Sequence, residues 1–180
     1  MSADLPLRDA TEADLPAVQA IYAHHVLRGT GTFEEVPPTL DEMRRRWGEV
    51  RERGFPWLVA GADHNVVGYA YANWFRPRSA FRFTCEDSVY VAPDHRARGL
   101  GSRLLGALLV RCEAAGARQM LGVIGDSAND ASVRLHARHG FTHAGTLRAV
   151  GLKFGRWLDV VLMQRALGAG AGTLPDTGLS

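Results

Sequence analysis

The feature that most constrains this chain is a turn that joins an apolar strand to a helix through arginines and glycines. Residues 89–91 have the pattern of a strand end, and residues 99–115 carry leucines at helical spacing. The turn contains Arg96, Arg98, Gly99 and Gly101. A helix start offers unpaired N–H groups and partial positive charge, and glycines let a phosphate approach the backbone. The turn therefore predicts a site for a diphosphate group.

Two common nucleotide-binding motifs do not fit this turn. A Walker P-loop requires Gly-Lys-Ser/Thr, whereas Gly101 is followed by Ser102 and Arg103. A Rossmann fingerprint requires a third Gly or Ala where this chain has Leu104. The turn alone leaves two interpretations open, which are a diphosphate site of another kind and a helix N-terminus capped by glycine.

The hydrophobic pattern predicts a mixture of helices and strands. Helices are expected at residues 11–26, 39–54, 99–115 and 129–139, the first two opened by caps at Thr11 and Thr39. Strands are expected near the N-terminus and at residues 56–62, 66–74, 83–91, 119–124, 141–147 and 157–165. The strands between residues 56 and 91 should run antiparallel. This order predicts an α+β protein with a mixed sheet.

Length and composition indicate one globular domain. The chain has 180 residues, of which 46% are hydrophobic and 22% charged. We assign the domain to residues 1–167 and expect residues 168–180, which lack bulky apolar periodicity, to be a disordered tail. No apolar run is long enough to cross a bilayer, and residues 1–10 lack a signal-peptide pattern, so we predict a cytoplasmic protein without a membrane partner.

Charge and metal-ligating residues exclude other classes of function. A formal net charge of +2 is too weak a footprint to predict a nucleic-acid partner. Cys85 and Cys112 form no CxxC pair and are expected to be buried thiols. His24 and His25 are adjacent on a helix and face different directions, so we predict no metal site.

Two segments resemble motifs of one enzyme superfamily. Residues 96–101 resemble the R/Q-x-x-G-x-G/A coenzyme A loop of the GNAT superfamily of N-acetyltransferases. Residues 129–141 resemble its N-x-x-(A/S)-x-x-L-(Y/H)-x-(K/R)-x-G-F motif. Residues 22–33, 84–91, 132–136 and 151–160 resemble the phosphinothricin and methionine sulfone acetyltransferase branch. The resemblance covers roughly residues 5–167.

The resemblance carries expectations for both fold and function. It implies the GNAT fold, with a mixed, mostly antiparallel central sheet of about six or seven strands flanked by about four helices, and a homodimer. It implies acetyl-CoA as co-substrate and direct attack by the α-amine of a small amino acid such as phosphinothricin, methionine sulfoximine or methionine sulfone. Two alternatives stay open, which are acetylation of another amine, such as a protein N-terminus or a polyamine, and coenzyme A binding without catalysis.

Glu86 is the candidate general base. An amine that is partly protonated at neutral pH must lose a proton before it attacks a thioester. The apolar neighbourhood of Glu86 should raise its pKa, and the related enzymes place their proposed base at the matching position. Alternation along a strand turns one of Glu86 and Asp87 outward, so an exposed Glu86 remains possible and Asp87 is the alternative base.

His136 is the candidate acid. It occupies the position where many members of the superfamily carry a tyrosine that protonates the leaving thiolate. An imidazole could return that proton or hold a water that does so. The alternative is a helix residue that packs beside the cofactor.

The remaining candidates bind the cofactor or the substrate. The predicted cofactor contacts are Val89, Tyr90, Val91, Arg96, Ala97, Arg98, Gly99, Leu100, Gly101, Ser102, Asn129 and Ser132. A backbone N–H of residues 88–90 should meet the oxyanion if the strand bulges or splays, and Asn129 could instead only cap its helix. The predicted substrate contacts are Phe33, Arg76, Arg78, Phe81 and Trp157. Their alternatives are a solvated basic loop for the arginines and core packing for the aromatic residues.

Overall fold

The computed structural model describes residues 5–63 and 65–175. Within them it contains four α-helices and a seven-stranded sheet, which confirms the predicted α+β class and the expected numbers of strands and helices. The elements are β1 (Leu7–Asp9), α1 (Leu15–Arg28), α2 (Leu40–Glu52), β2 (Trp57–Ala60), β3 (Gly68–Trp74), β4 (Thr84–Val91), α3 (Leu100–Ala114), β5 (Gln119–Gly125), α4 (Asp130–Arg138), β6 (Thr142–Lys153) and β7 (Arg156–Ala166). The strand order is β1-β2-β3-β4-β5-β7-β6.

The predicted cap at Thr39 opens α2, whereas the predicted cap at Thr11 opens a short 3-10 turn that leads into α1. Thr11 forms a capping box with Asp14, whose carboxylate accepts from the Thr11 backbone N–H at 2.8 Å. A short 3-10 turn (Glu12–Asp14) follows and continues directly into α1. Thr39 accepts from the backbone N–H of Glu42 at 3.2 Å and opens α2.

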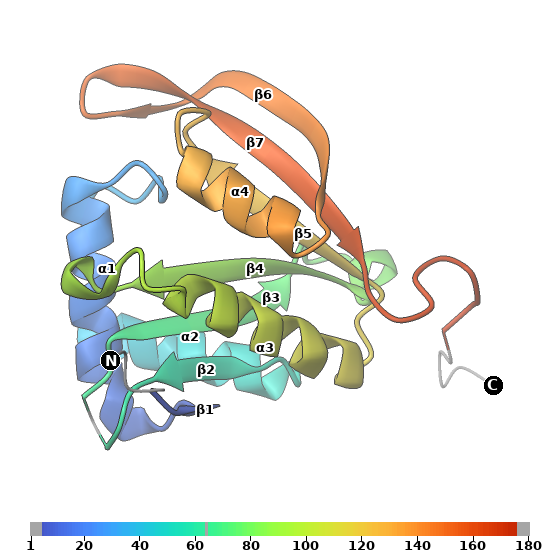
Figure 1. The fold of residues 1–180 in the computed structure, drawn as a ribbon, viewed down its shortest axis with the longest axis horizontal. Coiled ribbons are helices and arrows are strands. Elements are labelled where there is room, and N and C mark those ends of the chain that lie inside the picture. Colours follow the sequence, from blue (N-terminus) through green and yellow to red (C-terminus); the bar gives the residue numbers. More distant parts are fainter. Residues whose placement is uncertain (1–4, 64, 176–180) are drawn as a thin grey trace.

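The helices cover both faces of the sheet. In Figure 1, α3 and α4 lie in front of the sheet and α2 lies behind it. The front face packs against fully buried leucines of α3, including Leu104, Leu105 and Leu108. The rear face carries stacked rings, with Trp57 and Tyr71 4.1 Å apart between centroids. Both faces of the central strands are therefore shielded from water.

The sheet splits between its two parallel strands. β4 and β5 are paired from Thr84↔Gln119 to Asp87↔Gly122, and beyond that point both strands continue without pairing to each other. On its other side β4 stays paired with β3 as far as Val91. Figure 1 shows β4 and β5 diverging from the side where both begin. The edge of residues 88–91 that faces β5 is consequently left without a strand partner among the described residues.

Two expectations about the C-terminal region need comment. The predicted end of the sixth strand at residue 147 is wrong, because β6 continues to Lys153 by pairing with β7 across two register shifts. Residues 168–175 follow β7 in turns, where the Gly170 N–H donates to the Leu167 carbonyl. Residues 176–180 lie outside the described residues, so the disordered tail stays a prediction.

Three other properties bear on the function. Cys85 and Cys112 are free and buried, as the sequence predicts. In the described part of the chain, no helix has the length and apolar character needed to span a bilayer. The same residues contain no group of three or more His, Cys, Asp or Glu side chains placed to hold a metal ion.

Candidate active site

A cleft of about 640 Å³ opens where β4 and β5 separate. Its walls come from the C-terminal halves of both strands, from α1 and the loop that follows it, and from the starts of α3 and α4. The predicted site residues that line it are Phe33, Glu86, Val89, Tyr90, Val91, Arg96, Gly101, Asn129, Ser132 and His136. The structure thus brings together residues that are up to about a hundred positions apart in the sequence.

The turn before α3 is built to receive an anion at one end of this cleft. Ala97 and Gly99 have positive φ values of 60° and 75°, and such alternating left-handed conformations turn successive N–H groups to one side. The N–H groups of the first turn of α3 have no partner within the helix, and Arg96 adds a cation at the cleft wall. Gly101 lies between α4 and β4, because a Cβ there would be 3.6 Å from Leu135 and 3.9 Å from Val89. These residues fit a diphosphate group.

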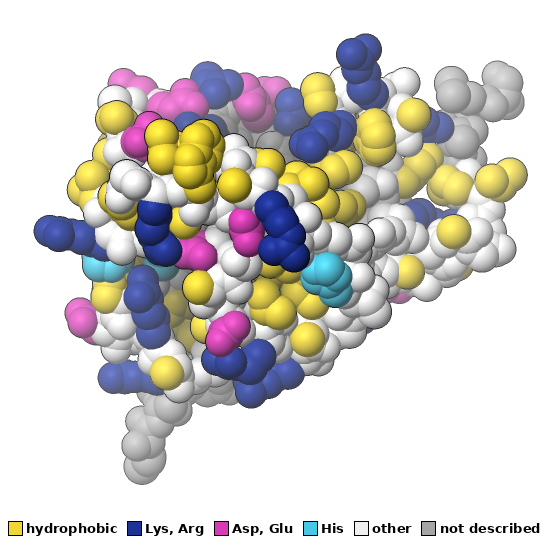
Figure 2. All heavy atoms as spheres, turned by 90° about the horizontal axis from the view of Figure 1, so that it is seen from above, with side chains coloured by type: hydrophobic (Ala, Val, Ile, Leu, Met, Phe, Trp, Pro, Cys, Tyr) yellow, Lys and Arg dark blue, Asp and Glu magenta, His cyan; other side chains and the backbone are white. Residues whose placement is uncertain are grey.

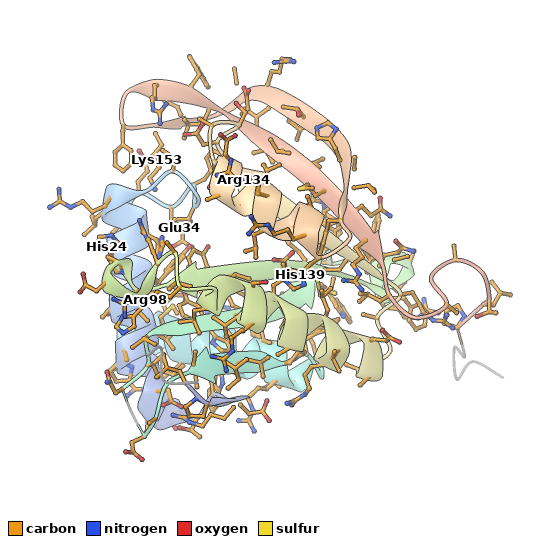
Figure 3. The ribbon with its side chains drawn as sticks, viewed as in Figure 1. His24, Glu34, Arg98, Arg134, His139 and Lys153 are labelled. Atoms are coloured by element: carbon orange, nitrogen blue, oxygen red, sulfur yellow. The ribbon has the colours of Figure 1, made fainter. Side chains whose placement is uncertain are left out.

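Other predicted cofactor residues support this turn without lining the cleft. They are Ala97, Arg98, Gly99, Leu100 and Ser102. The Ser102 hydroxyl forms a hydrogen bond of 2.8 Å with Nε2 of His139, which joins the start of α3 to the end of α4. In Figure 3, Arg98 is labelled just before α3 and Arg134 is labelled on α4.

Glu86 is half-buried and lines the cleft from the rear face of β4. Burial raises the pKa of its carboxyl to about 7, and the negative charge of Asp87 adds to the rise. Arg76 acts in the opposite direction, by lowering the pKa. A carboxyl with this pKa is poised to accept a proton near neutral pH.

Asp87 points to the other face of β4 and pairs with His136. Oδ2 of Asp87 lies 3.1 Å from Nε2 of His136, and both side chains are less than one-tenth exposed. The expectation that one of Glu86 and Asp87 faces solvent is wrong, because helices and loops cover both faces of β4. The two carboxylates therefore reach one cleft from opposite sides of the sheet.

The loop of residues 29–33 closes the cleft opposite α4. Lys153, at the end of β6, donates from Nζ to the carbonyls of Gly29 at 2.9 Å and Thr32 at 2.7 Å. In Figure 3, Lys153 lies beside the loop that leads to Glu34. The Phe33 ring packs against Gly125 and Gly151, where an added Cβ would lie 3.2 Å and 2.0 Å from it. Phe33 is therefore held as a wall of the cleft, and its contact with the substrate stays a prediction.

Four predicted substrate residues do not line the cleft. Arg76, Arg78 and Phe81 lie on the exposed segment between β3 and β4, and Trp157 is 65% exposed on β7. The guanidinium of Arg76 stacks over Phe75, 4.4 Å from its ring centroid. The sequence does not show which way each of these side chains turns.

Several cleft residues escaped the sequence analysis. Tyr22 and His25 of α1 line the cleft, and Nε2 of His25 is bonded to the Val91 carbonyl at 3.0 Å. The Tyr22 hydroxyl is bonded to Thr32 at 2.9 Å. Asp126 accepts from the Thr30 hydroxyl at 2.8 Å. Glycines at positions 29 and 31 are typical of a loop, but no local pattern in the sequence indicates where that loop docks.

The fold and the cleft define the class of protein. Residues 18–141 match the acetyltransferase (GNAT) family, and the chain belongs to that family. Phosphinothricin N-acetyltransferase of Alcaligenes faecalis is 56% identical over 170 residues, covering 94% of this chain and 86% of that relative. An L-methionine sulfoximine/L-methionine sulfone acetyltransferase of Pseudomonas aeruginosa is 47% identical over 161 residues, covering 88% of this chain and 92% of the relative.

A solved structure extends this similarity to the whole fold. The crystal structure of a GNAT superfamily phosphinothricin acetyltransferase from Sinorhizobium meliloti in complex with AcCoA superposes with a TM-score of 0.94. It is 45% identical and covers 98% of this chain and 95% of its own. The family and the branch indicated by the sequence motifs are thereby confirmed.

Proposed function

We propose that this chain transfers the acetyl group of acetyl-CoA to the α-amine of a small amino acid of the phosphinothricin, methionine sulfoximine or methionine sulfone type. The observation that carries the proposal is the position of Glu86, whose carboxyl has a pKa of about 7 and lines the cleft where β4 leaves β5. The relatives named above act on amines of this type and, in one structure, hold the acetyl donor.

The binding of acetyl-CoA follows from two features of the cleft. The N–H groups at the start of α3, together with Arg96, would hold the diphosphate. The edge of residues 88–91 has no strand partner, although the Val91 carbonyl is bonded to His25, and it would accept the pantetheine amides as a strand accepts its neighbour. Asn129, whose side chain accepts from the Ser132 N–H at 3.3 Å, lines the same cleft and keeps its capping role.

The transfer itself needs a base, an oxyanion partner and an acid. Glu86 accepts the amine proton, because its pKa lies near the working pH. An N–H on the free edge of residues 88–90 stabilises negative charge on the thioester oxygen. His136 lines the cleft and is the group from which the sulfur regains a proton.

The same proposal includes a homodimer and a reducing compartment. β6 is an edge strand, and the hairpin of β6 and β7 exposes Leu147, Val150, Leu152, Phe154 and Trp157, each between 48% and 65%. Figure 2, which views the molecule from above, shows several hydrophobic patches among basic and acidic side chains. An apolar sheet edge of this kind is suited to a second copy of the chain. The two free buried cysteines fit the cytoplasm.

The dimer is tested by light scattering after size-exclusion chromatography. Leu152→Glu should convert a dimer to a monomer, whereas Leu27→Glu, on the exposed side of α1, should not. A monomeric unsubstituted protein would contradict the dimer.

The activity is tested by a substrate screen that follows thiol release from acetyl-CoA. The panel contains phosphinothricin, methionine sulfoximine, methionine sulfone, ordinary amino acids, a polyamine and a peptide with a free N-terminus. We expect the first three to give the highest kcat/KM. A preference for the polyamine or the peptide would replace the proposed substrate class, and binding of acetyl-CoA without turnover of any amine would contradict the enzyme.

A further inference from the structure

We propose that Asp87 is a positioning residue for His136, and that the two side chains together hold the proton which the departing thiolate takes up. This inference deepens the proposed acetyl transfer and rests on it. The sequence indicated Asp87 only as an alternative base, and the structure gives it a different partner.

The hydrogen bonds of His136 fix where its protons are. Nδ1 lies 2.8 Å from the backbone carbonyl of Ser132, and a carbonyl can only accept, so Nδ1 carries a hydrogen. Nε2 lies 3.1 Å and 3.3 Å from the two carboxylate oxygens of Asp87. That contact requires one more proton, which resides either on Nε2, facing a carboxylate, or on Asp87, facing a neutral ring. In both forms the pair stores one transferable proton and has no net charge.

The surroundings keep this pair in one arrangement. A Cβ on Gly122 of β5 would lie 2.7 Å and 2.8 Å from ring atoms of His136 and 3.5 Å from Oδ1 of Asp87. The ring of Phe141 meets the His136 ring edge to face at 5.0 Å. Asp87 is 7% exposed and His136 is 4% exposed, yet both line the cleft. The pair is thus shielded from bulk water and open to the reaction site.

Charged and titratable neighbours of the pair come from three elements. On β4, Glu86 is the neighbour of Asp87. His139, at the end of α4, interacts with His136, and Cys112 of α3 lies near Asp87. Burial lowers the pKa of the His136 ring, but the hydrogen bond and charge of Asp87 and the hydrogen bond to the Ser132 carbonyl raise it, so the pKa lies above that of an ordinary histidine. Asp87 is therefore the group whose removal should alter the protonation of His136 most.

The proton balance of the reaction assigns the two carboxylates different tasks. As the C–N bond forms, Glu86 takes the proton of the amine, and as the C–S bond breaks, the Asp87–His136 pair gives its proton to sulfur. After one turnover Glu86 holds an extra proton and the pair lacks one. Transfer of one proton from Glu86 to the pair through solvent restores the starting state, so no other reactant is needed.

The test compares Asp87→Asn with the exposed control Asp41→Asn in the full-length protein. Asparagine keeps a hydrogen-bonding partner for Nε2 and cannot supply the proton. The assay uses an amine that the unsubstituted enzyme acetylates. We expect Asp87→Asn to lower kcat about 100-fold, which is within the range of general acid catalysis. The KM of acetyl-CoA and the melting temperature should stay near their original values. Asp41→Asn should match the unsubstituted enzyme. In ¹⁵N NMR spectra, the titration of His136 should move to lower pH in Asp87→Asn.

Each outcome decides one question. An unchanged kcat in Asp87→Asn, while the unsubstituted enzyme is active, overturns this inference and leaves the proposed function intact. An unsubstituted enzyme that acetylates no amine refutes the proposed function first. If Asp87→Asn does not fold, the titration of His136 in the unsubstituted protein decides, because a midpoint below that of an ordinary histidine, about 6.5, contradicts the shared proton.

Discussion

The side chains of Glu86 and Asp87 leave β4 on opposite faces of the sheet and line the same cleft. This is possible because β4 and β5 stop pairing after Asp87↔Gly122, so the cleft passes through the sheet at that point. Consecutive residues in one strand can then serve one reaction from two sides. Glu86 is placed to take a proton, and Asp87 is bonded to a histidine that can give one.

The pH dependence of turnover should follow the carboxyl of Glu86. Its pKa is raised to about 7, and a base acts only when ionised, so kcat should rise as the pH passes through about 7. At higher pH kcat should fall again, where the Asp87–His136 pair, whose histidine has a raised pKa, loses the proton that it gives to sulfur. Steady-state kinetics between pH 5 and 9 with saturating acetyl-CoA measure this directly. A kcat that is flat from pH 5 to 8 would exclude Glu86 as the base.

A methyl group on Gly151 should disturb the amine site through Phe33. The added Cβ would lie 2.0 Å from Cε1 of that ring, which must move. We expect Gly151→Ala to cost about 1–3 kcal/mol of folding stability and to raise the KM of the amine more than that of acetyl-CoA. Gly145→Ala, in the same strand with no neighbour near the added Cβ, is the matched control. Equal KM values in both variants would mean that Phe33 does not shape the substrate pocket.

Lys153 is the only lysine of the chain, which has 21 lysines and arginines in total. It is 1% exposed, and its ammonium group satisfies the carbonyls of Gly29 and Thr32. Lys153→Met leaves both carbonyls without that donor. We therefore expect the free energy of unfolding, measured in urea, to fall by about 1–3 kcal/mol, and the KM of the amine to rise. Lys153→Arg keeps the charge, but the planar guanidinium needs more room, so it should not restore the loop. Methionine at this position with unchanged stability would show that the loop is held by other contacts.

The sequence predicted those parts of the fold that depend on short-range patterns. The caps at Thr11 and Thr39, the leucine face of α3 and the glycine turn before it each lie within a few residues of the structure they specify. β6 is longer than predicted because pairing with β7 resumes at Gly151 after a register shift that follows Leu147, and no local hydrophobic pattern encodes such a shift.

The sequence indicated which residues belong to the candidate site, but not which of them contact one another. Glu86 and His136 could be assigned from motifs, but the bond between Asp87 and His136 joins residues 49 positions apart. Lys153 reaches a carbonyl 121 positions away. Such contacts depend on how the strands are ordered in the sheet. The direction in which the side chains of Arg76 and Trp157 point depends on the same order.

The central claim is tested most directly by the turnover number of Glu86→Gln, measured together with its affinity for acetyl-CoA by calorimetry. The account predicts a kcat lowered by about 100- to 10,000-fold for the amine that the unsubstituted enzyme prefers, with unchanged affinity, because glutamine has nearly the same shape and cannot accept the proton. A variant that keeps its turnover would contradict the account.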